Sequence, residues 1–145
     1  MDIAADGGSI EGKVEQLASD QTGCRLLQTR LDEDTTGETL KLVLSEVFEK
    51  LLQLMTDPFG NYLGQKIIEM CDDEQRLEIL QKISPSLTTI SLNTHGTRTV
   101  QKLVEVVQSD TERELVVNGL ADYVVALIND LNGNHVIQRC LSCFP

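Results

Sequence analysis

Apolar residues recur along the chain at the i, i+3, i+4 spacing of helices that bury one face. The longest such pattern covers residues 39–55 and places these residues on one face: Leu40, Val43, Leu44, Val47, Phe48, Leu51 and Leu52. Thr39 is expected to cap this helix, and Asp57-Pro58 to end it, because the residue before a proline is pushed out of the α region. Further helices are predicted over residues 11–18, 24–31, 61–71, 74–83, 87–92, 97–107, 112–128 and 134–143, with breaks at Ser84-Pro85-Ser86 and near Gly119 to Asp122. No segment indicates a strand, so the chain is predicted to be all-α.

A skeleton of polar and small residues recurs four times, at Asp20–Gln28, Asp57–Gln65, Asn93–Gln101 and Asp130–Gln138. Its glycines stand at 23, 60, 96 and 133, so successive units are 37, 36 and 37 residues apart. A fixed period of roughly 20 to 50 residues is typical of a solenoid. We therefore expect a flexible leader at 1–10 and repeats at 11–38, 39–74, 75–110 and 111–145, each with an inner helix that begins just after the glycine.

The first residues of the skeleton are expected to shape the turn into each inner helix. The Asp or Asn can accept backbone N–H bonds there. The glycine is expected either to take a positive φ or to permit a close backbone approach, because a Cβ resists both.

Composition and charge restrict what the core can be made of and which classes of protein the chain can belong to. Hydrophobic residues make up 41% and aromatic residues 3%, without Trp, so the core is predicted to consist of Leu, Ile and Val. No apolar run is long enough to span a membrane, and residues 1–9 lack the features of a signal peptide. The net charge of −11 argues against non-specific nucleic-acid binding by the whole surface, although a local basic stripe stays open.

The four cysteines show no disulfide-framework spacing. Cys140 and Cys143 form one C-x-x-C within a helical pattern, with His135 as the nearest third ligand. Because a structural zinc needs a fuller ligand set, we favour reduced thiols of a cytoplasmic protein and predict neither metal nor cofactor.

Three positions of each skeleton are candidates for ligand binding: the first and second residues after the glycine, and the glutamine itself. The sets are Cys24, Arg25, Gln28; Asn61, Tyr62, Gln65; Thr97, Arg98, Gln101; and Asn134, His135, Gln138. The first and third positions are one turn apart on the same helix face and can grip one edge of a nucleobase. The planar middle position can stack on unpaired bases. The open alternative is structural: the glutamine bridges repeats, and Tyr62 or His135 packs between them.

Gly-Cys-Arg-x-x-Gln, Gly-Asn-Tyr-x-x-Gln and Gly-Asn-His-x-x-Gln resemble the base-recognition helices of the Pumilio or PUF RNA-binding repeats, over roughly residues 11–144. The resemblance implies a right-handed α-solenoid of four PUF-like, armadillo-like repeats that binds single-stranded RNA, one base per repeat. It implies base-edge contacts from Cys24, Gln28, Asn61, Gln65, Thr97, Gln101, Asn134 and Gln138, and stacking by Arg25, Tyr62, Arg98 and His135. It implies adenine for the first and third repeats, where Thr97 departs from the usual Cys or Ser, and uracil for the second and fourth. Because PUF repeats read RNA antiparallel, the implied tract is 5′-UAUA-3′.

The four repeats resemble the N-terminal half of an eight-repeat PUF domain. This likeness implies binding to mRNA 3′ untranslated regions and a role in post-transcriptional repression or decay. It leaves room for protein partners on the convex face and for self-association through the uncapped C-terminal repeat.

Two other classes of function compete with RNA binding. A protein-interaction scaffold of the armadillo or HEAT kind would not need three matched positions per unit. An enzyme is less favoured, because His95 and His135 lie in different repeats without a nucleophile beside them. Half of the Lys and Arg residues fall in the inner helices, which predicts a basic inner face: Arg25, Arg30, Lys66, Arg98, Lys102 and Arg139.

Overall fold

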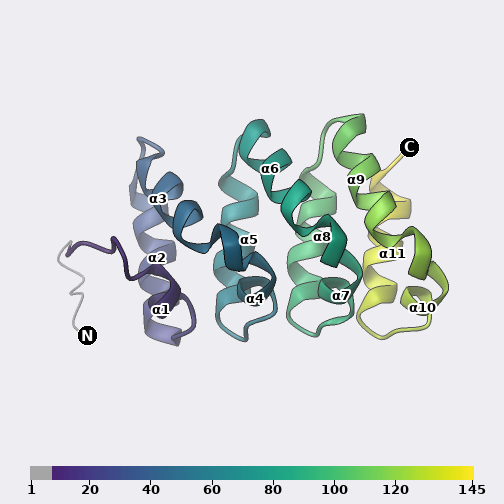
Figure 1. Ribbon diagram of the computed structural model, residues 1–145, viewed down its shortest axis with the longest axis horizontal. Coiled ribbons are helices and arrows are strands. Elements are labelled where there is room, and N and C mark those ends of the chain that lie inside the picture. Colours follow the sequence, from purple (N-terminus) through teal and green to yellow (C-terminus); the bar gives the residue numbers. More distant parts are fainter. Residues whose placement is uncertain (1–7) are drawn as a thin grey trace.

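The computed structural model describes residues 8–145, and every regular element in that range is a helix, as the apolar pattern predicts. In Figure 1 the inner helices stand side by side in one layer, and the outer helices cover them in a second layer. The inner layer consists of α2 (Gln21–Glu33), α5 (Gly60–Met70), α8 (Gly96–Val106) and α11 (Gly133–Cys143). The outer layer consists of α1 (Val14–Ala18), α3 (Glu38–Val47), α4 (Leu51–Met55), α6 (Asp73–Ile83), α7 (Leu87–Leu92), α9 (Asp110–Leu120) and α10 (Val124–Ile128).

The predicted leader at residues 1–10 is wrong at Ile10. Residues 1–7 of the predicted leader lie outside the described residues, whereas Ile10, also placed in that leader, is buried in the core. None of the helices between residues 8 and 145 is long and apolar enough to cross a membrane.

The predicted continuous helix over residues 39–55 is wrong in its middle and at its start. A 3-10 turn at Phe48–Lys50 separates α3 from α4, and the bend keeps Val47 and Leu51 buried on either side of it. The same break recurs at Ser84–Ser86, where a proline supplies it, and at Ala121–Tyr123. Thr39 is not the cap: Gly37 precedes α3 with φ 83°, and the Thr39 N–H donates to Asp34 Oδ2 at 2.7 Å.

The skeleton glycines serve close packing rather than backbone conformation. Only Gly12 and Gly37 have positive φ within the described range. A Cβ on Gly96 would lie 2.5 Å from Ile90 O, and one on Gly133 would lie 2.8 Å from a Leu127 methyl. The predicted starts of the inner helices are also slightly late, because α5, α8 and α11 begin at the glycine itself and α2 begins at Gln21.

The core is built from Leu, Ile and Val, as composition predicts, with Met55 among its largest fully buried side chains. It runs continuously between the two layers because each unit offers apolar residues at the same register. Leu31, Ile68 and Val104 hold equivalent places on α2, α5 and α8, and each is 1% exposed.

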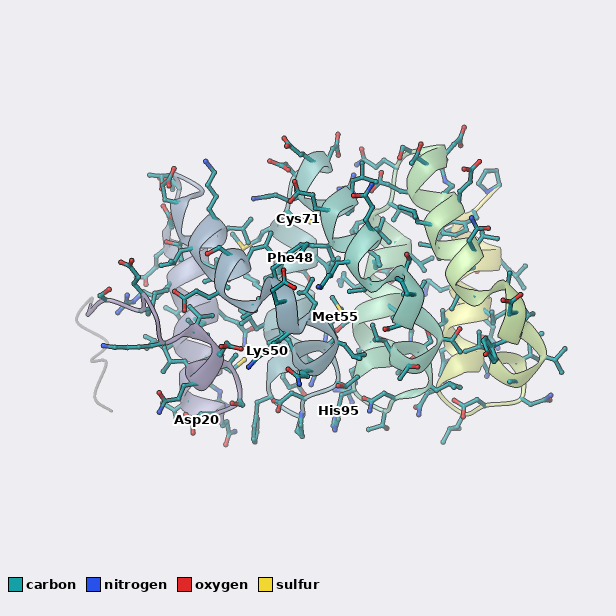
Figure 2. The ribbon with its side chains drawn as sticks, viewed as in Figure 1. Asp20, Phe48, Lys50, Met55, Cys71 and His95 are labelled. Carbon is teal, nitrogen blue, oxygen red and sulfur yellow. The ribbon has the colours of Figure 1, made fainter. Side chains whose placement is uncertain are left out.

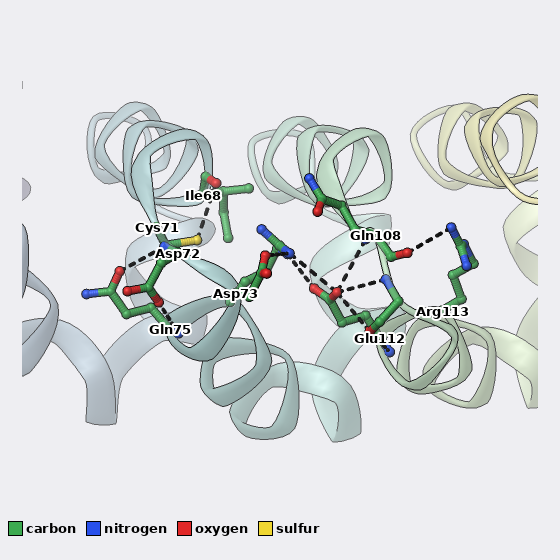
Figure 3. A network of polar contacts seen from close by, with 10 residues as sticks. Ile68, Cys71, Asp72, Asp73, Gln75, Gln108, Glu112 and Arg113 are labelled. Atoms are coloured by element: carbon green, nitrogen blue, oxygen red, sulfur yellow. Dashed lines mark hydrogen bonds and ion pairs between the residues drawn. The ribbon is translucent and has the colours of Figure 1, made fainter.

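A buried ion pair joins the outer layers of the third and fourth units (Figure 3). Arg76 Nε on α6 donates to Glu112 Oε2 on α9, and both side chains are at most 5% exposed. Arg76 also bonds Asp73 at 2.6 Å, while Ser109 and Glu112 form a capping box. Burial alone would raise the pKa of Glu112, but hydrogen bonds from Arg76 and Ser109 outweigh it and lower that pKa to about 2. Glu112 is therefore a buried carboxylate with its partners fixed.

Candidate nucleic-acid interface

Each inner helix starts from a loop that a single polar side chain holds. Carboxylate or amide oxygens of Asp20, Asp57, Asn93 and Asp130 accept the N–H of the glycine three residues on, at 2.8, 2.6, 2.9 and 2.8 Å. Asp20 and the loop residue His95 lie along the same edge of the molecule (Figure 2). The predicted turn-shaping role of these four residues is confirmed, and the same hydrogen bond recurs at the entry to all four inner helices.

The first and third positions act as a pair in every unit. The glutamine Nε2 donates to the side chain one turn earlier at 2.8 to 3.4 Å, in the pairs Gln28–Cys24, Gln65–Asn61, Gln101–Thr97 and Gln138–Asn134. Both members therefore lie on one helix face, as the four-residue spacing predicts. The bond fixes the direction of each glutamine amide along the surface that α2, α5, α8 and α11 form, here called the inner-helix face.

The first position also serves the fold. Cys24 and Thr97 are 2% and 5% exposed, and they donate to Phe59 O at 3.1 Å and to Asn132 O at 3.0 Å in the next unit's loop. Asn61 is fully buried, with its amide donating to Asp57 O and Pro58 O. Burial raises the pKa of the Cys24 thiol, so it stays neutral. The first position therefore has a structural role that the sequence did not indicate, and the half-buried or exposed glutamines offer the accessible polar groups.

The middle positions are exposed in all four units: Arg25, Tyr62, Arg98 and His135. Arg98 Nη1 donates to Tyr62 Oη at 3.2 Å, so middle side chains of neighbouring units meet. A pocket of about 420 Å³ between the first two units is lined by Gln21, Cys24, Arg25, Gln28, Pro58, Phe59 and Tyr62. Its size falls in the range of roughly 300–1,000 Å³ that small-molecule sites occupy. The structure therefore brings one complete set of predicted positions together with the middle residue of the next unit.

The inner-helix face is less basic than the sequence predicts. Three of its cations pair with acids of the preceding inner helix: Lys66 with Asp32, Lys102 with Glu69 at 3.1 Å, and Arg139 with Glu105. Sequence analysis missed these pairs, although a signal exists: the acid stands nine residues after one glycine, and the base six residues after the next.

Within residues 8–145, no group of three His, Cys, Asp or Glu side chains could hold a metal ion. Burial and the neighbouring Cys143 raise the pKa of Cys140 to about 11, so this thiol is a poor ligand. The face offers instead a row of amides between planar side chains.

Helical units in one register, stacked side by side with matched polar positions on one layer, define an α-helical repeat protein. Residues 9–145 match the family model described as the NOP9-like PUF repeat domain. The chain belongs to the PUF repeat family.

Similar proteins carry the same assignment. Over 90% of its length the chain is 43% identical to Pumilio homolog 12 of Arabidopsis thaliana, and it covers 22% of that protein. The Puf4 RNA-binding domain bound to the HO endonuclease RNA 3′ UTR recognition sequence matches 95% of the chain, with 45% identity and a TM-score of 0.86. The domain of yeast Puf5p bound to MFA2 RNA matches 91%, with 39% identity and a TM-score of 0.87. The chain spans 41% and 38% of those two solved chains, and about a fifth of the Arabidopsis protein.

Proposed function

We propose that the inner-helix face binds single-stranded RNA sequence-specifically, one base per unit. The observation that carries this proposal is the fourfold register of a glutamine, its bonded partner one turn earlier and an exposed planar side chain. Glutamine presents a donor and an acceptor to a base edge, and the planar groups of adjacent units can stack on both faces of a base. The open pocket beside Gln28, between Arg25 and Tyr62, is such a slot.

The relatives support this reading, since the Puf4 and Puf5p domains were solved with RNA bound. We carry over the base-edge role to Cys24, Gln28, Asn61, Gln65, Thr97, Gln101, Asn134 and Gln138, and the stacking role to Arg25, Tyr62, Arg98 and His135. The proposed tract is 5′-UAUA-3′ within mRNA 3′ untranslated regions. The proposed outcome is post-transcriptional repression or decay in the cytoplasm, without catalysis by this chain. The repeats proposed to do this span 11–38, 39–74, 75–110 and 111–145.

Fluorescence anisotropy with labelled RNAs tests the proposal. We expect UAUA-containing RNA, including UGUAUAUA, to bind more tightly than a scrambled RNA. The double variant Asn61→Ser/Gln65→Glu should move the preference at the third base of UAUA from uracil to guanine, because a carboxylate accepts the guanine N–H donors. Gln81→Glu makes the same chemical change at an exposed outer-layer position and should leave binding unchanged.

Circular dichroism must show that each variant is folded, since Asn61 also holds its own loop. A folded chain that binds UAUA and scrambled RNA equally at micromolar concentration would refute the proposal and favour a scaffold for protein partners, on the convex face or elsewhere.

A further inference from the structure

Neighbouring inner helices are linked by ion pairs in one register. In each junction the acid lies nine residues after the skeleton glycine, and the base of the next unit lies six residues after its own glycine. The three pairs are Asp32–Lys66, Glu69–Lys102 and Glu105–Arg139, here called the ion-pair ladder. The positions without a neighbouring inner helix among the described residues hold Thr29 and Ser142. At these two positions of the unit, a charged residue therefore stands only where the neighbouring inner helix carries a residue of opposite charge.

The second and third ion pairs of the ladder are connected through Lys102 and Glu105. Lys102 lies 3.1 Å from Glu69 and 3.9 Å from Glu105, and Glu105 also pairs with Arg139. One chain of charges thus joins α5, α8 and α11. The side chain of Lys66 is only 22% exposed, and that of Lys102 30%. Because the two lysines are partly shielded, their pairs keep more of their Coulomb attraction than fully exposed pairs do, although Asp32 and Glu69 are themselves 60% and 46% exposed.

The ladder lies next to the proposed reading row. Asp32, Glu69 and Glu105 each follow a reading glutamine by four residues, so they lie one turn further along the same helix face. Each paired base follows the glutamine of its own unit directly in sequence, as Lys66 follows Gln65. The pair between Asp32 and Lys66 therefore ties the helix segment that carries Gln28 to the one that carries Gln65.

We propose that the ion-pair ladder fixes the distance between successive reading glutamines and so enforces one nucleotide per unit. The ladder residues are positioning residues: they act through the spacing of the inner helices and not through contact with a base. This inference rests on the proposed RNA-binding function and concerns its tolerance for an extra nucleotide.

The first junction offers the sharpest test, because Lys66 is bridged there by Asp32 alone. Anisotropy would compare 5′-UAUA-3′ with 5′-UAUCA-3′, which carries one inserted nucleotide between the bases proposed for the first two units. The wild-type chain should prefer UAUA. Asp32→Asn, Lys66→Gln and the like-charge variant Asp32→Lys should each reduce this preference, by at most about fivefold for a lost pair of this kind. The swapped variant Asp32→Lys/Lys66→Glu should restore it.

The matched control is Lys82→Gln, which removes an ion pair at 2.8 Å to Glu49 between units of the outer layer. It breaks a link between units without touching the inner layer and should leave the preference unchanged. If Lys66 instead bound an RNA phosphate, Asp32→Asn would strengthen binding to both RNAs. The swapped variant Asp32→Lys/Lys66→Glu would then not restore the preference for UAUA. That result, or an unchanged preference in all ladder variants, would overturn the inference while RNA binding stands. Equal binding of UAUA and scrambled RNA by the wild-type chain would overturn both proposals.

Discussion

The skeleton glycines show how a single absent side chain sets the contact between the two layers. Gly96 touches the carbonyl of Ile90 so closely that a Cβ would need the backbone of α7 or α8 to move. Gly64 lies in the interior of α5, where a Cβ would meet only ordinary contacts, the nearest at 3.5 Å from Met55. Both glycines are buried, but the packing excludes a Cβ at Gly96 and has room for one at Gly64.

We expect Gly96→Ala to destabilise the chain by about 1–3 kcal/mol, because overpacking against backbone cannot relax through a rotamer change. Gly64→Ala should stabilise it by about 0.5–1 kcal/mol, because alanine is the better helix former and restricts the unfolded chain. Urea unfolding followed by circular dichroism measures both. Equal effects of the two substitutions would show that the close approach at Gly96 has no energetic weight.

The contacts between helices were harder to predict from the sequence than the helices themselves. The helices themselves, the all-α class and the turn-shaping role of Asp57 and its equivalents could be predicted, because they depend on local spacing. The breaks at Ser84–Ser86 and Ala121–Tyr123 were predicted as well, the first from its proline and the second near Gly119 to Asp122. The break at Phe48–Lys50 could not be predicted, since it contains neither proline nor glycine. The ion-pair ladder and the buried pair of Arg76 and Glu112 were missed because their partners stand 33 to 36 residues apart, beyond the range of any single-helix pattern. The paired positions of the candidate site were predicted by four-residue spacing, but the burial of Cys24, Asn61 and Thr97 depends on the neighbouring loop.

The link between α6 and α9 should give the chain an acid-sensitive stability. The pKa of Glu112 is about 2 in the folded chain and near 4.5 when unfolded, so its contribution is complete above pH 4.5 and is lost as pH falls towards 2. Glu112→Gln should cost about 3–5 kcal/mol at pH 7, because it leaves the Arg76 charge buried with only exposed Asp73 as a partner. Urea unfolding at pH 7, 4.5 and 3 should show this difference shrinking below pH 4.5. Glu114→Gln, exposed on the same helix, is the control, and a difference that is constant with pH would contradict the assignment.

The whole molecule is asymmetric in how it covers its apolar surface. The large exposed apolar residues of the last unit include Val117, Ile128 and Leu141, at 50%, 50% and 79%. At the equivalent register Leu80, Met55 and Val104 are at most 1% exposed, because the following unit covers them. The surface formed by Val117, Ile128 and Leu141 thus continues the row of buried contacts between units, while none of the large exposed apolar residues lies between residues 8 and 51.

This asymmetry predicts that the 145-residue chain self-associates through its last unit rather than head to tail. Two copies that pack their last units together would bury Ile128 and Leu141 of both, whereas the first unit offers no matching apolar surface. Sedimentation velocity should show a concentration-dependent dimer at micromolar concentrations. Leu141→Asp/Ile128→Asp should yield a monomer, and Leu52→Asp, which changes an exposed leucine of the second unit, should not. A wild-type monomer at all concentrations, with the same helical signal as the double variant, would show that the exposed area is too small to hold two copies together.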